Sequence, residues 1–246
     1  MVCGEIAMLQ VVCWKWAPEK ESKHFMKRSG FSAKHVNVLY ASLQRFLTLP
    51  HKLVCVTDDY AGIRPEVTIM GIDSYFKYFK ELGGCYRRLR AFDRVGIFGQ
   101  KFISIDLDVV LAGNLDRIFG FEEDFKIWED TFRRRTPYCG SLWGMETGAR
   151  ERVWEEFFTH PELSIRQARE KGFIGTDQAV VSSMLYPREA TWTVADGIYN
   201  FNTQIRANGK ALPTNARLVF FNGKYDPSQH NLQARYPWIK ELWKDE

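Results

Sequence analysis

An apolar strand, an amphipathic helix and a second apolar strand follow one another early in the chain, and this order most constrains the fold. Residues 8–14 (MLQVVCW) form a short, β-branched run that favours a buried strand. Apolar residues then recur at helical spacing from Ser32, an N-cap residue type, to Phe46. Residues 52–57 (KLVCVT) predict a second strand. This spacing predicts a βαβ unit, with parallel strands and a right-handed crossover.

Shorter elements are predicted along the rest of the chain. We expect strands at 67–70, 102–105, 126–128, 138–144 and 217–221, and helices at 85–95, 149–159 and 177–185. No internal repeat, low-complexity tract or break in composition marks a linker. The pattern therefore predicts one α/β domain with a Rossmann-like nucleotide-binding half over about residues 1–112. A mixed second half follows over about 113–246.

Composition narrows the classes of protein. A hydrophobic fraction of 45% and an aromatic fraction of 15% predict a folded core. The net charge of +4 is too small to indicate a nucleic-acid partner. Polar residues interrupt each apolar run before the ~18 residues of a transmembrane segment, and residues 1–10 lack the pattern of a signal peptide. The five cysteines never form CxxC, so we expect no disulfide framework or zinc site and favour a cytoplasmic location.

Two acidic residues, Asp106 and Asp108, interrupt the otherwise apolar run 102–111 (FISIDLDVVL). Carboxylates in such surroundings are costly unless a cation neutralises them. Residues i and i+2 of an extended segment face the same side, so both carboxylates can address one hard cation at a strand end. The alternative is a turn in which the aspartates cap backbone amides. A capping role needs only one acid, so the pair favours a metal site.

Further motifs stand in a distinctive order between Leu9 and Pro227. They are the apolar first strand, Arg88-Leu89 before the acidic pair, Asp106-x-Asp108, residues 138–143 (YCGSLW), Asp177-Gln178 opening a helix, and residues 220–223 (FFNG). In this order the chain resembles GT-A-fold glycosyltransferases. It is most similar to the retaining family that includes glycogenin and the bacterial lipopolysaccharide galactosyltransferases, glycosyltransferase family 8.

The resemblance implies a single GT-A domain whose second half binds the acceptor. It implies a nucleotide-sugar donor, expected to be a UDP-sugar, and an acceptor hydroxyl on a glycan, a lipid-linked molecule or another compound. It also implies that the transferred carbon keeps its anomeric configuration. Manganese or magnesium would be held by Asp106, Asp108 and Asn222. Asp177 and Gln178 would be the catalytic pair beside the donor sugar. The remaining donor-binding positions would be Trp14, Asp58, Arg88, Asp106, Cys139, Gly140, Ser141, Gly223 and Lys224.

Three positions depart from the family pattern. Asn222 stands where relatives carry a histidine ligand, and a carbonyl oxygen suits manganese less well than an imidazole does. Asp226 replaces a lysine, although Lys224 lies close enough in sequence to contact phosphate instead. Cys139 stands where many relatives have asparagine, which passes the sugar contact to Gly140 or Ser141.

Other functions remain as alternatives at this point. The segment Asp106-Leu-Asp108-Val-Val110 also resembles the nucleophile motif of haloacid-dehalogenase-type phosphatases, but three predicted strands precede it and no later acidic pair is evident. A nucleotidyltransferase would need a glycine-rich, basic signature after the first strand, and that signature is absent. A non-catalytic module that binds a sugar or nucleotide stays open. The arginines 133–135 favour a solvated loop, or else a contact with an anionic acceptor.

Overall fold

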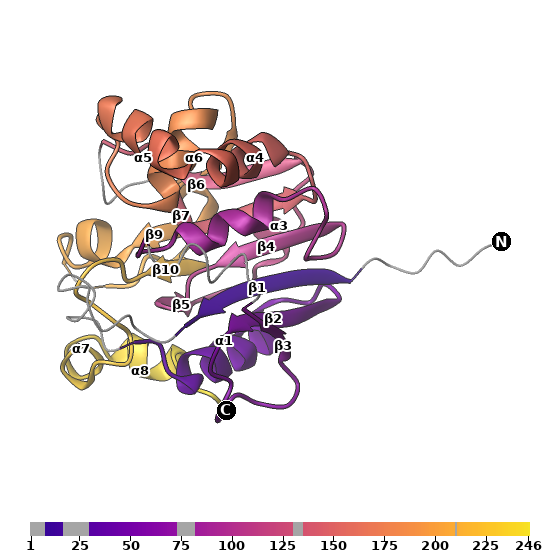
Figure 1. The fold of residues 1–246 in the computed structure, drawn as a ribbon. Coiled ribbons are helices and arrows are strands. Elements are labelled where there is room, and N and C mark those ends of the chain that lie inside the picture. Colours follow the sequence, from indigo (N-terminus) through magenta and orange to yellow (C-terminus); the bar gives the residue numbers. More distant parts are fainter. Residues whose placement is uncertain (1–7, 17–29, 73–81, 130–134, 210) are drawn as a thin grey trace.

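The large sheet is built around the predicted βαβ unit. The computed structural model describes residues 8–16, 30–72, 82–129, 135–209 and 211–246 (Figure 1). Its first elements are β1 (Leu9–Lys15), α1 (Ala33–Phe46), β2 (His51–Thr57), β3 (Thr68–Gly71) and β4 (Lys101–Ile105). The four strands are parallel in the order β3-β2-β1-β4. The parallel pair that the sequence predicts, β1 with β2, is therefore confirmed.

The sheet becomes mixed beyond β4. It continues through β7 (Tyr138–Glu146), β6 (Phe125–Glu129) and β8 (Ala190–Trp192). β7 is antiparallel to both β4 and β6, whereas β6 and β8 are parallel. Together these strands make the seven-stranded mixed sheet of an α/β protein, as the sequence predicts.

A second, three-stranded sheet begins where the acidic pair interrupts the chain. It has the order β5-β10-β9, formed by β5 (Val109–Leu111), β10 (Leu218–Phe220) and β9 (Ile198–Asn200). β4 ends at Ile105 and β5 begins at Val109, so residues 106–108 carry the chain from one sheet to the other. This crossing brings strands from both halves of the sequence around Asp106 and Asp108.

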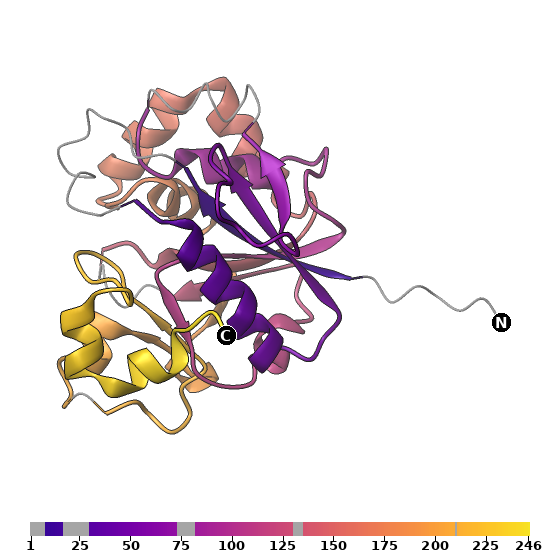
Figure 2. The same ribbon diagram turned by 90° about the horizontal axis from the view of Figure 1, so that it is seen from below.

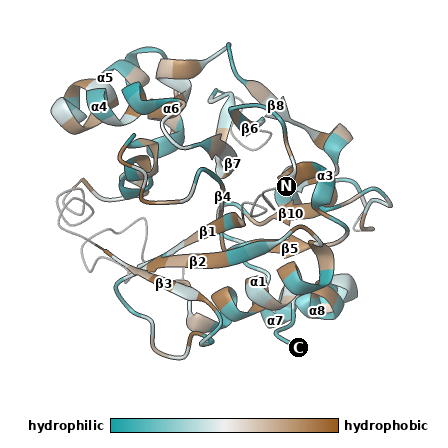
Figure 3. Cartoon of the chain, turned by 90° about the vertical axis from the view of Figure 1, so that its right-hand side faces the viewer, coloured by the Kyte–Doolittle hydropathy of each residue, from teal (hydrophilic) through white to brown (hydrophobic). Residues whose placement is uncertain are grey.

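Helices lie on both sides of the sheets. The group α4 (Glu151–Thr159), α5 (Pro161–Glu170) and α6 (Asp177–Leu185) lies at the top of Figure 1, and the short α3 (Asp116–Phe119) follows β5 in the chain. At the opposite side α1 runs beside α7 (His230–Arg235) and α8 (Pro237–Leu242), as Figure 2 shows. Figure 3 shows apolar residues gathered along β1 and β2. None of the helices in the described part combines the length and apolar character needed to cross a membrane.

Several elements differ from the sequence-based expectation. The helix expected at 85–95 is a shorter 3₁₀ helix, η1 (Tyr86–Phe92), whose seven residues are all buried. The sequence did not predict α5, because its surface is mostly polar and only Ser164 and Ala168 are buried. It also did not predict β5, β8 and β9, because three-residue strands are too short for a periodic pattern. The other unpredicted elements are α3, α7, α8, the 3₁₀ helix Val194–Asp196 and the π-helix Phe201–Ile205.

Candidate functional site

A buried arginine joins two acidic residues that are far apart in the sequence. Arg88 of η1 binds Asp177 Oδ2 through Nε at 2.8 Å and through Nη2 at 2.7 Å. Its Nη1 donates a hydrogen bond to Asp106 Oδ1. The side chains of Arg88 and Asp177 are each 6% exposed, whereas that of Asp106 is 22% exposed. Asp106 thus forms the solvent-facing end of an otherwise buried ion cluster.

The charges in this cluster depend on one another. Burial alone would lower the pKa of Arg88, but Asp106 and Asp177 outweigh it and raise that pKa well above the usual value. Burial raises the pKa of Asp177, Arg88 opposes this rise and Asp106 adds to it. Arg88 therefore stays cationic, and the negative charge of Asp177 depends on Arg88.

Gly140 of β7 lets the backbone approach this cluster. A Cβ atom at this position would lie 2.9 Å from Arg88 Nη2 and 3.0 Å from Asp177 Oδ2. Either contact is closer than a real Cβ atom tolerates without a shift of its neighbour. The absence of a side chain at residue 140 therefore keeps room for the ion pair.

The amino terminus of α6 is tied to the loop before η1. Cys85 donates its backbone N–H to Thr176 Oγ1 at 3.2 Å, and Thr176 Oγ1 donates to Asp177 Oδ1 at 3.1 Å. A Cβ at Gly84 would lie only 2.4 Å from Thr176 Cγ2, so the two segments pack tightly. Burial raises the pKa of the Cys85 thiol to about 11, which keeps it neutral and unreactive at ordinary pH.

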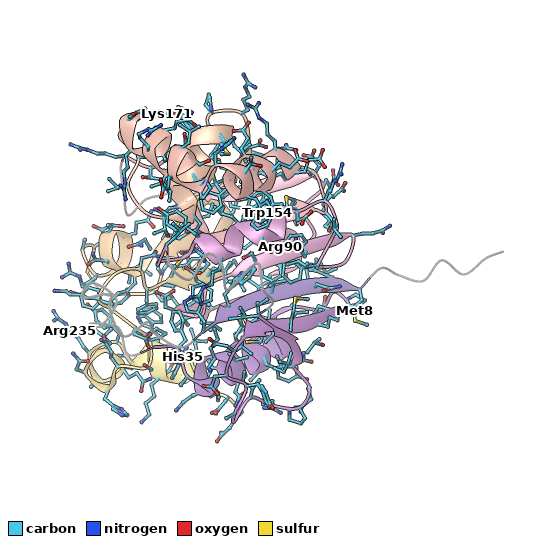
Figure 4. All side chains as sticks on the ribbon, viewed as in Figure 1. Met8, His35, Arg90, Trp154, Lys171 and Arg235 are labelled. Atoms are coloured by element: carbon cyan, nitrogen blue, oxygen red, sulfur yellow. The ribbon has the colours of Figure 1, made fainter. Side chains whose placement is uncertain are left out.

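The arginines beside Arg88 on η1, Arg87 and Arg90, do not face solvent. Arg87 and Arg90 are buried. The Arg87 guanidinium lies 5.1 Å from the Trp16 ring centre, and that of Arg90 lies 5.3 Å from the Trp154 ring centre (Figure 4). Arg90 also pairs with Asp93. Each of the three arginines thus has its own partners, and Arg88 is the one that contacts Asp106 and Asp177.

A hydrogen-bonded chain of polar side chains lies beside the acidic pair. Asn200 Nδ2 donates to Asn222 Oδ1 at 2.8 Å, and Asn222 Nδ2 donates to Ser141 Oγ at 2.9 Å. The carbonyl of Ser141 accepts the backbone N–H of Asp106 at 2.9 Å, and that of Asp108 accepts the backbone N–H of Phe221 at 2.8 Å. These backbone hydrogen bonds hold Ser141 and the residue before Asn222 next to Asp106 and Asp108.

Asp106 and Asp108 offer a two-carboxylate set of hard oxygen ligands. Asp108 is 1% exposed, and Asp106 reaches solvent at the end of β4. Such a pair fits Mg²⁺ or Mn²⁺ that takes its further ligands from phosphate and water. No group of three histidine, cysteine, aspartate or glutamate side chains in the described residues is placed to hold a metal ion. The oxygen of Asn222, expected as a third ligand, already accepts the hydrogen bond from Asn200.

Some of the other expected site residues are buried, and others reach solvent. Trp14 is buried; its Nε1 donates to Ser104 Oγ at 2.9 Å and its ring meets Phe98 edge-on, so it packs as a core residue. Cys139 is also buried, and its thiol donates to Ser141 Oγ at 3.4 Å. Asp58 and Lys224 are exposed, and Gln178 is half-buried in the first turn of α6. Gly223 has a positive φ of 89°, which glycine adopts without strain. Of the arginines 133–135, residues 133 and 134 lie outside the described residues.

The sequence analysis missed Asn200 and Thr176. Asn200 is fully buried, although its neighbours in the chain gave no reason to separate it from an ordinary turn residue. A polar residue between apolar ones in the stretch 198–201 (IYNF) is the one signal that could have marked it. Thr176 directly precedes α6, but its side chain makes no capping bond and contacts Cys85 and Asp177 instead.

Solved glycosyltransferases resemble the chain over most of its length. The galactosyltransferase LgtC, crystallised with donor and acceptor sugar analogues, is 11% identical with a TM-score of 0.65 over 95% of this chain and 96% of LgtC. GlyE of Streptococcus pneumoniae is 11% identical with a TM-score of 0.60; the match covers 96% of this chain, which spans only 60% of GlyE. Mouse xyloside xylosyltransferase 1 is 11% identical with a TM-score of 0.55 over 87% of this chain and 97% of its own.

The chain has a GT-A glycosyltransferase fold. The GT-A expectation from the sequence is therefore confirmed, although no protein-family model and no curated protein matches the sequence. In this GT-A domain the acidic pair lies where the central sheet passes into the smaller one. The helix group α4–α6 supplies Asp177 from the other side.

Proposed function

We propose that this GT-A protein transfers a sugar from a nucleotide-sugar donor to an acceptor hydroxyl. The observation that carries the proposal is the cluster in which Arg88 lies between Asp106 and Asp177. It gathers one cation and two acids from three separate elements at the carboxyl end of β4, where α/β sheets bind ligands. The fold supports sugar transfer over the phosphatase alternative, because its solved neighbours are glycosyltransferases.

The donor's parts suit different residues of the site. The resemblance favours a UDP-sugar, with the uridine near Asp58 at the exposed end of β2 and the sugar near Asp177 and Gln178. Arg88 holds the Asp177 carboxylate in one orientation through two nitrogen atoms, which would fix that carboxylate against sugar hydroxyls. Lys224 is exposed and would meet phosphate oxygens. Retention at the transferred carbon is part of the same proposal.

A divalent cation, Mn²⁺ or Mg²⁺, would be held by Asp106 and Asp108. Bound there, it would neutralise charge that develops on the departing nucleoside diphosphate. Asp106 keeps its place through its contact with Arg88, so the ligand nearest to solvent is already oriented. Cys13, Cys55, Cys85 and Cys139 are free thiols, which suits the cytoplasmic location that we propose.

The test of this function separates transfer from simple binding. The full chain is incubated with UDP- and GDP-sugars and Mn²⁺, and release of the nucleoside diphosphate is followed with and without candidate acceptors. We expect one sugar nucleotide to be consumed. Binding of the donor, seen as a rise in melting temperature, without any release would favour a non-catalytic binding module instead.

Variants of the catalytic pair sharpen this test. Asp177→Asn and Gln178→Ala should keep the affinity for UDP, because UDP lacks the sugar that these side chains address. Turnover should fall by about 10²-fold through loss of positioning and electrostatic stabilisation. Asp116→Asn serves as a control. Asp116 begins α3 and binds Thr48, so it lies outside the Arg88 cluster. Wild-type turnover in both Asp177→Asn and Gln178→Ala would remove the pair from the active site.

A further inference from the structure

The backbone N–H of Thr203 fixes the orientation of the Asn222 side chain, and it acts through Asn200. The backbone N–H of Thr203 can only donate, and it meets Asn200 Oδ1 at 3.0 Å. Thr203 Oγ1 meets the same oxygen at 3.1 Å. Asn200 must therefore turn its amide nitrogen toward Asn222, at a distance of 2.8 Å. The atom of Asn222 that faces Asn200 must then be an acceptor, namely its oxygen.

The same reasoning sets the other end of the Asn222 amide. With its oxygen turned to Asn200, its NH₂ group faces Ser141 Oγ at 2.9 Å. Ser141 is adjacent to the acidic pair, because its carbonyl accepts the N–H of Asp106. Residue 222 thus presents N–H groups, and not its carbonyl oxygen, toward Ser141, whose backbone pairs with Asp106. A positively polarised N–H group is the wrong end of an amide for a metal ion and the right end for an anion.

We propose that Asn200 is a positioning residue that holds Asn222 as a hydrogen-bond donor to the phosphate oxygens of a bound nucleoside diphosphate. Asn222 is then no ligand of the metal ion. Phosphate oxygens only accept hydrogen bonds, so they match an NH₂ group that is half-buried and fixed on its oxygen side. Of the acceptors in the described residues, Ser141 takes one N–H of this group, and in the proposal the second N–H donates to a phosphate oxygen. The inference deepens the proposed function and rests on it.

The first test measures metal binding without any nucleotide. Mn²⁺ titrations followed by electron paramagnetic resonance compare the wild type with Asn222→Ala and Asn222→Asp. Asn222→Ala should bind Mn²⁺ as the wild type does, within about twofold. Asn222→Asp adds a third carboxylate beside Asp106 and Asp108, so its affinity for Mn²⁺ should rise by about tenfold or more. A loss of Mn²⁺ affinity in Asn222→Ala, or no gain in Asn222→Asp, would overturn the proposal.

The second test measures UDP binding by calorimetry at an Mn²⁺ concentration that saturates each variant in the first test. Asn222→Ala should weaken the binding of UDP by about tenfold, as expected for one lost hydrogen bond to a charged group. Asn200→Ala should weaken it similarly, although residue 200 touches no ligand. Thr203→Val keeps the backbone N–H that orients Asn200 and should therefore bind UDP as the wild type does. Asn202→Ala is the matched control, because the side chain of Asn202 binds only Arg206, the residue after the π-helix, in the described residues.

The outcomes of the two tests are separable. Unchanged UDP affinity in Asn222→Ala, in a variant whose melting temperature is that of the wild type, overturns the phosphate contact. Weakened binding in Asn222→Ala but not in Asn200→Ala overturns the positioning role of Asn200. If the wild type bound no UDP at all, the proposed function and the phosphate contact would both fail. The Mn²⁺ titrations would still decide whether the amide of residue 222 is a metal ligand.

Discussion

At the scale of single residues, the site is dominated by the ion cluster of Arg88. One guanidinium serves two carboxylates, of which Asp177 is as buried as the arginine itself. Burying these charges is costly, and removal of one partner leaves the other without compensation. The cluster therefore holds η1, α6 and the end of β4 together, and loss of any one of its charged side chains should destabilise the fold. It is a structural unit as well as a candidate for donor recognition.

Substitution of Arg88 should therefore lower the stability of the fold, whatever its effect on donor binding. Arg88→Ala leaves Asp177 buried without its cation, and the free energy of unfolding should fall by about 3–5 kcal/mol. Adding Asp177→Asn removes the uncompensated charge and should recover part of that loss. Urea unfolding of the two single variants and the double variant provides the measurement. Strictly additive losses would show that the two side chains are not coupled.

Gly140 offers a second prediction at this scale. In Gly140→Ala the new methyl group would press on both Arg88 Nη2 and Asp177 Oδ2. Separating this buried pair should lower the free energy of unfolding by about 1–3 kcal/mol. Gly71→Ala is the matched control, because a Cβ at Gly71 meets nothing within 4 Å. Equal stability of the two variants would contradict the close approach at residue 140.

At the scale of elements, α1 is joined to the segment before α7 by one histidine. His35 Nδ1 accepts the backbone N–H of Ser32 at 3.2 Å, so its proton lies on Nε2, which donates to Asp226 at 3.2 Å. The ring lies against Phe31 and Trp243 (Figure 4 labels His35 beside α8). Asp226 in turn accepts the N–H and hydroxyl of Ser228. Asp226, which stands where the family pattern has a lysine, thus has a structural role.

This contact predicts an acid-dependent contribution to stability. Burial alone would raise the pKa of Asp226, but hydrogen bonds from His35 and Ser228 outweigh it and leave the pKa below its usual value. Such a carboxyl stabilises the fold above its unfolded pKa of about 3.9, and the stabilisation is lost as pH falls through the folded pKa. Asp226→Asn should thus melt below the wild type at pH 6, and the gap should narrow from about pH 5 to pH 3.

Melting temperatures of the two proteins across this range decide the matter. A gap that keeps its size down to pH 3 would show that the charge of Asp226 contributes nothing. A variant as stable as the wild type at pH 6 would show that the contact between α1 and the α7 segment is dispensable.

At the scale of the whole molecule, the two halves of the sequence share both sheets. β4 pairs with β7, and β5 pairs with β10, so strands of residues 1–112 have partners in the second half. A third buried cluster joins Val38 of α1 to Phe201, Tyr236, Ile239 and Trp243. The single-domain expectation stays a prediction, and these contacts lead us to expect one cooperative unit.

We therefore expect residues 1–112, expressed alone, not to fold. The fragment would leave one edge of β4 and the edge of β5 that faces β10 without their partners from residues 138–146 and 218–220. Circular dichroism should show no cooperative melting of the fragment. The full chain should melt in one transition, at the same temperature by circular dichroism and by tryptophan fluorescence. Two separate transitions, or a fragment with its own transition, would contradict the prediction.

The elements that the sequence predicted well are those whose pattern is local. β1, α1, β2 and β4 were found because runs of apolar residues with strand or helix spacing are long enough to be distinctive. The acidic pair was found for the same reason, since Asp106 and Asp108 stand out within an apolar run. η1 is shorter than the helix expected at 85–95, and its arginines Arg87 and Arg90 are covered by Trp16 and Trp154, which are distant in sequence.

The sequence by itself determined the βαβ start, the α/β class and the place of the acidic pair, because each depends on neighbouring residues. Only the tertiary structure decided that Arg88 holds Asp177, 89 residues away, and that Asn222 turns its oxygen to Asn200. Both outcomes depend on hydrogen bonds between segments that meet only after the sheets have formed. The direction of an amide or a guanidinium is set by partners distant in sequence, so no local pattern encodes it.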